Sequence, residues 1–406
     1  MGMDRETICV YGLSHFGIPL ASLCSTKGYK VYGYEPCEKT IESLNQDPDI
    51  QDALYDVTLS DSSSSIAKSD VIIVCLSLKK DERDQIEFKP LKQAMKTIRD
   101  NLKPGALIIV ESTINPGVTE EIIKPLLEER YNDGADFFLA HCPERINPGD
   151  KEWTVENLPR VLGSTSEQGL EEAYDFYKSI LTAEIKKMSS IKATEAVKIV
   201  ENSFRDVNIA FVNELAKSFD SLGIDINEVI LGCSTKPFGF LPHFPSCGVG
   251  GHSIPVEPYY LVEKAQESDF SNSFLRLARK VNNSMPQYTV DLVSKSLNKF
   301  GLPIKGTKIG ILGLSYKAGV KDTRSSPSYE VINILKEMGA ELKIHDPHVP
   351  TDSNAEIEDV LSSDCVVLLT NHPEFKDLDF TNTKCVVDGH NFLEKETIEN
   401  YTGIGR

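Results

Sequence analysis

The chain has 406 residues, which at roughly 100–200 residues per domain is enough for two or three domains. Its formal net charge of -18 argues against a nucleic-acid-binding protein, because such a protein needs a basic face, but it still permits a small anionic ligand. There is no run of about 18 apolar residues, so the sequence predicts neither a transmembrane helix nor a membrane partner.

The start of the chain and its cysteines both predict a cytoplasmic protein. Residues Met1 to Thr7 lack the apolar core of a signal peptide, and Glu6 stands where myristoylation at Gly2 needs Ser or Thr. Nine cysteines are an odd number in a long chain, which favours free thiols over disulfides. No group of Cys and His has the spacing of metal ligands, so we predict no metal.

The first part of the chain, residues 1–190, alternates short apolar runs with helical patterns. The runs expected to form strands are 7–11, 30–34, 71–76, 107–110 and 137–140. Continuous apolar strands separated by helices indicate a parallel sheet covered on both faces. The polar, Asp- and Ser-rich segment 46–66 is expected to be a loop with a short helix.

The second part, residues 191–295, begins with a helix expected from Lys192 to Leu222, since this stretch contains no Pro or Gly. Gly223 is a stop signal, and a helix of this length more often joins domains than covers a surface. The Gly- and Pro-rich stretch Lys236–Pro258 is too long for a simple connection, and we expect a functional loop.

The third part, residues 296–406, repeats the alternation of strands and helices, with strands expected at 308–313, 342–345, 365–369 and 385–387. The predicted fold class is therefore α/β, with two Rossmann-like doubly wound domains joined by a long central helix.

A glycine turn after the first strand indicates a dinucleotide site. Gly12-Leu13-Ser14-His15-Phe16-Gly17 matches the pattern G-x-G-x-x-G, with Ser14 at the middle glycine. Glu35 ends the next strand, where an acidic side chain accepts hydrogen bonds from the adenosine ribose and repels a 2′-phosphate. The turn therefore predicts NAD rather than NADP. The alternative is a Rossmann-like unit that binds another nucleotide or none.

Two strand ends carry polar groups that could serve catalysis. Ser112 and Thr113 follow a strand, where their hydroxyls could position a ligand or water, and helix N-capping is the alternative. Glu144, in the segment from His141 to Gly149, is a candidate base or water-orienting group, and the alternative is a surface salt bridge.

Lys198 and Asn202 lie four residues apart on the long helix and therefore on one face. Together they could stabilise an oxyanion. The alternative is a set of exposed helix pairs that includes Glu195 and Glu201.

The segment Gly248–Pro258 places Ser253 behind three glycines. Glycines allow a substrate to approach the backbone closely, so this segment is the candidate active-site loop. The alternative is a glycine-rich turn with no chemistry.

These segments, in this order, resemble the UDP-glucose/GDP-mannose dehydrogenase family over nearly the whole chain. The motifs that carry the resemblance are Cys142-Pro143-Glu144-Arg145, Ala196-Val197-Lys198 to Asn202, Arg205-Asp206-Val207-Asn208, Gly248-Val249-Gly250-Gly251-His252, Pro258-Tyr259-Tyr260-Leu261, Gly313-Leu314-Ser315-Tyr316-Lys317 and Asp322-Thr323-Arg324. The residues in these motifs are most similar to those of the UDP-N-acetylhexosamine branch of the family. The resemblance favours UDP-N-acetylmannosamine as the substrate over UDP-N-acetylglucosamine or UDP-glucose.

The resemblance implies two successive oxidations at sugar C6, from alcohol to aldehyde to acid, each reducing one NAD. It implies that the first domain binds NAD, the last binds UDP, and the central helix forms a homodimer. Lys198 and Asn202 would stabilise the oxyanion, and Glu144 with Thr119 would orient water or assist proton transfer. Ser77 and Thr113 would join the glycine turn at the cofactor. The implied substrate-binding residues are Glu144, Arg145, Lys198, Asn202, Arg205, Gly250, Gly251, His252, Lys317 and Arg324.

Ser253 departs from the pattern, because the family has a cysteine nucleophile at this position. A hydroxyl needs an adjacent base, and an oxygen ester hydrolyses more slowly than a thioester, so we expect a slow second half-reaction. The change could be an introduced substitution, a natural variant or the mark of a paralogue that only binds its ligand. Cys247 is not expected to replace it, since it lies before the glycines.

Smaller departures are Ser14, the segment Ser77–Lys80, Ser246-Cys247, Glu257 in place of Asp and His390 in place of Arg. Two other classes of function stay open: a nucleotide-sugar-binding protein without catalysis, and a 3-hydroxyacid dehydrogenase of similar layout. The complete second α/β domain argues against the latter.

Overall fold

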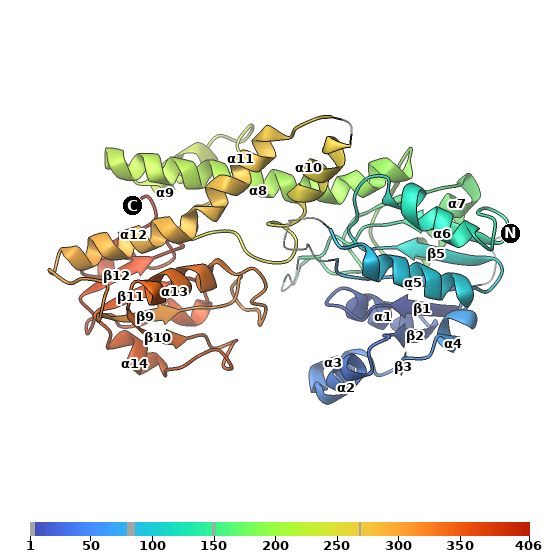
Figure 1. Ribbon diagram of the computed structural model, residues 1–406, viewed down its shortest axis with the longest axis horizontal. Helices are drawn as coiled ribbons and strands as arrows, with labels where there is room; N and C mark the ends of the chain where they lie inside the picture. Colours follow the sequence, from blue (N-terminus) through green and yellow to red (C-terminus); the bar gives the residue numbers. More distant parts are fainter. Residues whose placement is uncertain (1–4, 79–85, 148–149, 151, 268) are drawn as a thin grey trace. The chain divides into compact units, whose positions relative to one another are not determined.

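The computed structural model describes residues 5–78, 86–147, 150, 152–267 and 269–406 (Figure 1). Expectations that fell on Met1, Gly2, Lys79, Lys80, Pro148 and Gly149 lie outside the described residues. By backbone proximity the chain forms two compact units, of which unit 1 contains residues 1–201 and 259–270 and unit 2 contains residues 202–258 and 271–406. The division into parts 1–190, 191–295 and 296–406 stays a prediction.

Unit 1 is built on an eight-stranded sheet with the order β3-β2-β1-β4-β5-β6-β7-β8. Its strands are β1 (Thr7–Tyr11), β2 (Lys30–Tyr34), β3 (Val57–Ser60), β4 (Val71–Val74), β5 (Ala106–Val110), β6 (Phe137–His141), β7 (Arg160–Ser164) and β8 (Ile185–Lys187). Only the β6–β7 pair is antiparallel in this sheet. The first six strands have the order 3-2-1-4-5-6 of a dinucleotide-binding Rossmann sheet.

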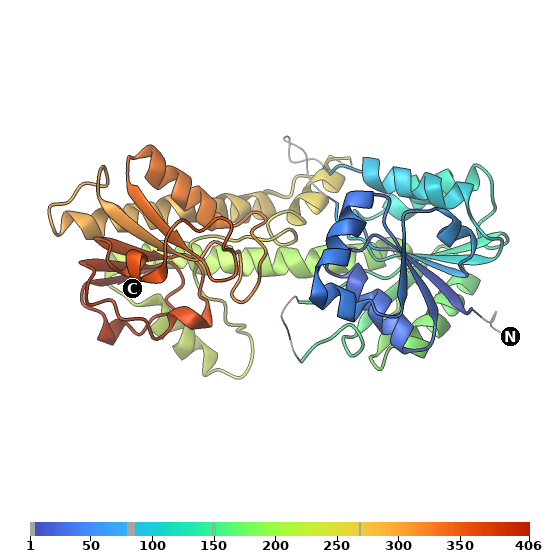
Figure 2. The same cartoon turned by 90° about the horizontal axis from the view of Figure 1, so that it is seen from below.

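Helices cover both faces of this sheet, as Figure 2 shows for unit 1. Successive side chains of a strand point to opposite faces, so Ile8 and Val10 join one core while Cys9 and Tyr11 join the other. The first core is closed by α1 (Gly17–Thr26) and α7 (Glu167–Ile180), and the second by α5 (Lys89–Asp100) and α6 (Lys124–Glu128). The remaining helices of this part of the chain are α2 (Glu38–Gln46), α3 (Pro48–Ala53), α4 (Ser64–Ala67) and the π-helix η1 (Thr119–Ile123).

The expectation of a loop with a short helix at 46–66 is wrong in part. This segment contains α3, the strand β3 and the start of α4. Strand β3 lies at the sheet edge, and of its residues only Val57 is buried. A short edge strand with one buried side chain has too little apolar pattern to be recognised in an Asp- and Ser-rich segment.

Helix α8 (Ile191–Leu222) has 32 residues and runs from unit 1 into unit 2. It ends as expected at Gly223, which adopts a φ of 69°. The amide of Ile224 donates to the carbonyl of Phe219 at 3.0 Å, which satisfies a carbonyl of the last turn. The prediction of a long helix that joins two Rossmann-like units is confirmed.

Unit 2 contains a five-stranded, all-parallel sheet with the order β10-β9-β11-β12-β13. Its strands are β9 (Lys308–Leu312), β10 (Glu341–His345), β11 (Cys365–Leu368), β12 (Cys385–Asp388) and β13 (Tyr401–Gly403). The helices of this part of the chain are α9 (Ile226–Ser234), α10 (Pro258–Gln266), α11 (Ser273–Asn283), α12 (Met285–Asn298), α13 (Pro327–Glu337), α14 (Ile357–Leu361) and the 3-10 turns η2 (Pro373–Phe375) and η3 (Lys395–Thr397).

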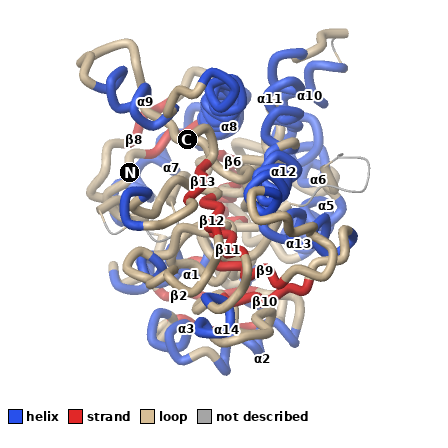
Figure 3. Tube along the Cα trace, turned by 90° about the vertical axis from the view of Figure 1, so that its left-hand side faces the viewer, coloured by secondary structure: helices blue, strands red, loops and turns tan. Residues whose placement is uncertain are grey.

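Helices α12 and α13 pack on one face of this sheet (Figure 3), and α14 with η2 packs on the other. The nine cysteines are all free, which confirms the expectation of thiols rather than disulfides. Within the described ranges, no helix is both long and apolar enough to cross a membrane.

A buried ionic group supports the carboxyl ends of β5 and β6 in unit 1. Glu111 and Arg160 are each 1% exposed, and their charged atoms lie 3.3 Å apart. The Tyr177 hydroxyl donates to the second oxygen of Glu111 at 2.5 Å. A charge buried in this way needs its partners, because removing one leaves the other unpaired in a low-dielectric interior.

We therefore predict that Arg160→Met lowers the free energy of unfolding of unit 1 by about 3–5 kcal/mol. Trp153, the one tryptophan of the chain, lies in unit 1, so its fluorescence during urea unfolding reports this unit. The matched control is Lys27→Met, which removes an exposed ion pair to Glu156 and should cost at most about 1 kcal/mol. Equal losses in the two variants would contradict the prediction.

Candidate active site

The glycine turn of unit 1 leaves no room for side chains at its first and last glycines. Gly12 adopts a φ of 94°, and a Cβ there would lie 2.9 Å from the carbonyl oxygen of Cys75. A Cβ on Gly17 would lie 2.2 Å from the carbonyl oxygen of Gly12. These are the tight turn and the close packing that the dinucleotide fingerprint requires.

Ser14, at the middle position of the fingerprint, is part of the turn's own hydrogen bonding. Its hydroxyl donates to the Cys75 carbonyl at 3.1 Å and accepts from the Gly17 amide at 3.4 Å. The serine therefore ties the turn to the end of β4. His15 and Phe16 follow with their rings 5.2 Å apart, and Phe16 is buried at the start of α1.

Glu35 lies directly after β2 and is half-buried. Burial raises the pKa of its carboxyl group, against hydrogen bonds from the backbone of Cys37 and Leu13 that lower it. The contact with Leu13 places the carboxylate beside the glycine turn. The turn, the start of α1 and this carboxylate together fit the phosphates and ribose of NAD.

The end of β5 carries the two hydroxyls that the sequence singled out. The Ser112 hydroxyl accepts from the Leu76 amide at 2.8 Å and lies 3.2 Å from the Val74 carbonyl, so it joins the ends of β4 and β5. It does not cap the helix that follows, since η1 has no side-chain cap bond. Thr113 is partly exposed and Ser77 is exposed at the end of β4.

Thr119 is fully buried, and its backbone is held by Glu195 of α8. The Glu195 carboxylate accepts from the amides of Thr119 at 2.8 Å and Gly117 at 2.5 Å. Burial raises the pKa of Glu195, although these hydrogen bonds oppose the rise. The interpretation of Glu195 as an exposed helix residue is therefore wrong, because its side chain clamps the turn that carries Thr119.

Glu144 and Lys198 form a buried pair in unit 1, with 3.7 Å between the carboxylate oxygen and the ammonium nitrogen. Their side chains are 11% and 9% exposed, so the alternative of a surface salt bridge is wrong. The Ile146 amide also donates to Glu144. A carboxylate held beside an ammonium group can orient water while the ammonium faces developing negative charge.

Arg145 is bound by Glu201, the other glutamate of α8 that the sequence pattern offered as an exposed residue. The guanidinium donates to both carboxylate oxygens of Glu201 and to the carbonyl of Pro159, the latter at 2.9 Å. Such a bidentate pair fixes the geometry of the arginine. Its predicted contact with substrate stays a prediction.

In unit 2, Asn202 and the candidate active-site loop are joined by Glu257. The Asn202 side-chain amide donates to the Glu257 carboxylate at 2.5 Å. The Glu257 amide donates to the Ser253 carbonyl at 2.8 Å, so the two residues span one helical turn. Glu257 is 3% exposed, whereas Ser253 is partly exposed. Sequence reasoning noted Glu257 only as a departure, although its spacing from Ser253 could have indicated a shared face.

The glycines before Ser253 are required by packing against the loop after β9. A Cβ on Gly250 would lie 2.7 Å from the Cβ of Tyr316, and one on Gly251 would lie 3.0 Å from the Tyr316 ring. The Gly251 amide also donates to the Arg324 carbonyl at 2.9 Å. Tyr316 belongs to one of the motifs that carry the family resemblance, but only the structure places it against the glycines.

The remaining predicted substrate contacts of unit 2 differ in their exposure and in their partners. Arg324 is exposed and donates to both oxygens of Asp322, and the resulting hydrogen bonds raise the pKa of Arg324. His252 and Lys317 are partly exposed, and Arg205 is exposed on α8. The structure thus gathers the Tyr316–Arg324 segment and the glycines, while roles in binding stay predictions.

Cys247 and His390 are turned towards the core of unit 2. Cys247 is fully buried, and burial raises the pKa of its thiol to about 12, so it is unsuited to replace the nucleophile. One ring nitrogen of His390 lies 3.0 Å from the Leu369 carbonyl, and burial lowers the pKa of this histidine. A neutral ring here does not supply the cationic contact of an arginine.

The Rossmann order of the sheet, the glycine turn and the carboxylate after β2 define an NAD-binding Rossmann protein. The sequence matches the NAD binding domain of the UDP-glucose/GDP-mannose dehydrogenase family over residues 6–181, its central domain over 192–284 and its UDP binding domain over 310–395. The chain belongs to the UDP-glucose/GDP-mannose dehydrogenase family and is an NAD-dependent UDP-sugar dehydrogenase.

Individual relatives are similar over nearly their whole length. The UDP-N-acetyl-D-mannosamine dehydrogenase of Pyrococcus horikoshii is 33% identical over 98% of this chain and 99% of its own. A UDP-N-acetyl-D-glucosamine 6-dehydrogenase of Pseudomonas aeruginosa is 33% identical over 94% of both chains. The solved structure of the Pyrococcus horikoshii mannosamine enzyme has a TM-score of 0.92 at 32% identity, covering 98% of this chain and 99% of that one.

For the cofactor site, we predict that Glu35→Ala weakens NAD binding roughly tenfold or more and relaxes the exclusion of NADP. The ionised carboxylate is the hydrogen-bond acceptor, and its pKa is raised, so NAD affinity should fall as the pH drops through a value above the usual 4.5. Calorimetric titration of NAD and NADP measures both effects. Glu38→Ala, which removes an exposed carboxylate from the first turn of α2, should leave both affinities and the pH profile unchanged.

Proposed function

We propose that this chain oxidises a UDP-N-acetylhexosamine, with UDP-N-acetylmannosamine favoured, at C6 from alcohol to carboxylate in two steps. The observation that carries the proposal is the arrangement of α8, which presents Lys198 and Asn202 one turn apart. Lys198 lies 3.7 Å from Glu144, and Asn202 lies 2.5 Å from Glu257. A cation and an amide donor held by buried carboxylates suit a reaction in which an alcohol oxygen becomes negative.

The side chains divide the work as follows. When bound at the glycine turn and Glu35, NAD would supply the acceptor for the hydride that leaves the sugar carbon. Lys198 and Asn202 stabilise the negative charge on the sugar oxygen, and Glu144 orients water or moves a proton. The family resemblance predicts that Thr119 assists Glu144. Because Thr119 is fully buried and Thr113 is partly exposed, Thr113 is the hydroxyl better placed to reach a ligand.

Ser253 occupies the position of the nucleophile in this proposal. Its hydroxyl oxygen adds to the aldehyde carbon while the hydroxyl proton passes to the former carbonyl oxygen, which gives a hemiacetal. This carbon then loses a hydride, for which a second NAD would be the acceptor, and the hemiacetal hydroxyl loses its proton, which leaves an ester on the serine oxygen. Water then attacks the ester carbon, one of its protons goes to the departing serine oxygen, and the other is released as the acid product ionises to the carboxylate. A hydroxyl is a weaker nucleophile than a thiolate, and its ester hydrolyses more slowly than a thioester. The second half-reaction is therefore the slow one.

We predict that Ser253→Cys raises the rate of carboxylate formation roughly 10- to 100-fold, because a thiol is partly ionised at neutral pH. NADH production with NAD and UDP-N-acetylmannosamine measures turnover, and intact mass detects the covalent adduct. Ser253→Ala, which has no nucleophile, should release aldehyde and form no adduct. If the cysteine variant gains no turnover, Ser253 is not at the position of the nucleophile.

Relatives of equal identity are named for mannosamine and for glucosamine substrates. UDP-N-acetylglucosamine and UDP-glucose are therefore the alternative substrates in the same assay. A nucleotide-sugar-binding protein without catalysis would bind UDP-sugar and yield no NADH from either Ser253 or its cysteine variant. The cytoplasmic location expected from the free cysteines stays a prediction.

We also propose that the chain forms a homodimer through α8. Val200, Phe204 and Phe211 are 53%, 52% and 57% exposed on this helix. The spacing of four and seven residues places them on one stripe, and a stripe of large exposed apolar side chains marks an interface.

Accordingly, Phe204→Glu combined with Phe211→Glu should convert the dimer to a monomer at micromolar concentration, because each charge would be buried without a partner. Sedimentation equilibrium measures the mass. Tyr55→Glu is the matched control, since Tyr55 is an 86% exposed aromatic residue that does not belong to α8, and it should leave the mass unchanged. A monomeric parent chain would contradict the proposal.

A further inference from the structure

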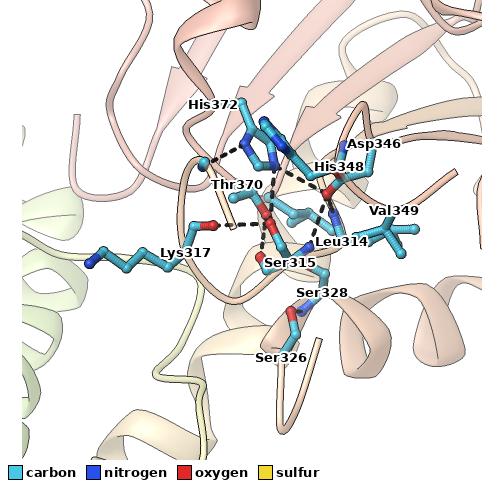
Figure 4. A network of polar contacts seen from close by, with 12 residues as sticks. Leu314, Ser315, Lys317, Ser326, Ser328, Asp346, His348, Val349, Thr370 and His372 are labelled. Atoms are coloured by element: carbon cyan, nitrogen blue, oxygen red, sulfur yellow. Dashed lines mark hydrogen bonds and ion pairs between the residues drawn. The ribbon is translucent and has the colours of Figure 1, made fainter. Parts of the chain in front are cut away.

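A buried polar cluster lies at the carboxyl ends of β9, β10 and β11 in unit 2 (Figure 4). Ser315 follows β9, Asp346 follows β10, and Thr370 and His372 follow β11. Asp346 and Ser315 are each 1% exposed and His372 is not exposed at all. The cluster was not among the candidate residues of the sequence, and none of the roles proposed above uses it.

Asp346 is the acceptor at the centre of the cluster. One carboxylate oxygen accepts from the amides of Leu314 at 2.6 Å and Ser315 at 3.0 Å, and from His372 Nε2 at 3.1 Å. The other accepts from the His348 amide at 2.8 Å. Burial opposes ionisation, but these hydrogen bonds outweigh it and hold the pKa of Asp346 well below its usual value.

His372 connects the two ends of the loop 313–319. The Gly319 amide donates to His372 Nδ1 at 3.1 Å, so this nitrogen carries no proton. Nε2 therefore carries the proton and donates to Asp346, with the Ser315 hydroxyl also 3.1 Å away. The ring is held in place by Phe375, whose centroid lies 5.4 Å away in an edge contact.

The loop held in this way carries Tyr316 and Lys317. The Ser315 hydroxyl donates to the Lys317 carbonyl at 3.0 Å, and Thr370 donates to the Ser315 carbonyl at 2.6 Å. Figure 4 shows the Lys317 side chain extending away from the cluster. Tyr316 packs on Gly250 and Gly251, so the cluster also supports the loop that leads to Ser253.

Residues of this cluster could instead bind a metal ion. His348, His372 and Glu374 each offer a ligand atom within 4.8 Å of the others. Both ring nitrogens of His372 are already committed, however, one to the Gly319 amide and one to Asp346. An ion would have to break one of these hydrogen bonds, so the geometry favours support of the loop.

We propose that His372 is a positioning residue for the UDP-sugar, acting through the loop 313–319 that carries Tyr316 and Lys317. This inference rests on the proposed function, in which Lys317 lies at the UDP-sugar. His372 contributes to the affinity of unit 2 for the nucleotide because its two ring nitrogens hold opposite ends of the loop 313–319.

Two substitutions separate the two nitrogens. In His372→Asn the amide oxygen can replace Nδ1 as the acceptor for Gly319, while the donor to Asp346 is lost. In His372→Gln the amide nitrogen can replace Nε2 as the donor to Asp346, while the acceptor is lost. Each should raise the Kd for UDP about fivefold, and His372→Leu, which loses both, about 25-fold.

The experiment is calorimetric titration of the full chain with UDP and, separately, with NAD. The expected result is a graded rise of the Kd for UDP with an unchanged Kd for NAD, a split that a general loss of structure would not produce. His345→Gln is the matched control, because His345 contacts the Ala355 carbonyl at the same sheet edge, and its Kd for UDP should stay within about twofold. Melting curves identify a variant that fails to fold, in which case the Asn and Gln variants carry the test.

An unchanged Kd for UDP in folded His372 variants overturns the inference and leaves the proposed function standing. Equal losses for UDP and NAD overturn it as well, since the effect would then be global. Failure of the parent chain to bind UDP, with NAD still bound, overturns the proposed function itself. Loss of UDP binding in EDTA that zinc restores would make His372 a metal ligand instead.

Discussion

The contacts of α8 are the constraint on which the rest of the site depends. Over two turns, four polar side chains of this helix bind residues of separate loops. Glu195 binds the Thr119 amide and Lys198 pairs with Glu144. Glu201 binds Arg145, and Asn202 binds Glu257. Three of the four helix residues have the spacing i, i+3 and i+7, so they share one face. Since a helix fixes the distances between its own side chains, the loops that carry Thr119, Glu144 and Arg145 acquire a defined geometry within unit 1 from one rigid element.

The two Rossmann-like units carry an acidic residue at the same topological position, but the residue has a different role in each unit. In each unit an acidic residue follows the second strand of the fold, Glu35 after β2 and Asp346 after β10. Glu35 is half-buried beside a glycine turn, which suits a carboxylate that accepts from ribose hydroxyls. Asp346 is fully buried and accepts four hydrogen bonds from its own unit, so its carboxylate braces a loop.

Glycines in this protein are required by the protein's own packing before any ligand is considered. A side chain on Gly12 or Gly17 would clash with a backbone carbonyl oxygen, and a side chain on Gly250 or Gly251 would clash with Tyr316. A Cβ at each of these positions would approach another atom to 3.0 Å or less. The loop that leads to Ser253 therefore takes its shape from the segment after β9, and the same segment is braced by the buried cluster around His372.

The sequence by itself determined the α/β class, the long helix, the dinucleotide turn and the family, because apolar periodicity and motif order are local properties. It missed β3, where only Val57 is buried, and it interpreted Glu144 and Glu195 as possible surface residues. The tertiary structure decided that these carboxylates are buried and which groups they hold. Glu195 bonds the Gly117 amide 78 residues away, and no local pattern carries that information, because burial of a charge depends on segments brought together only by folding.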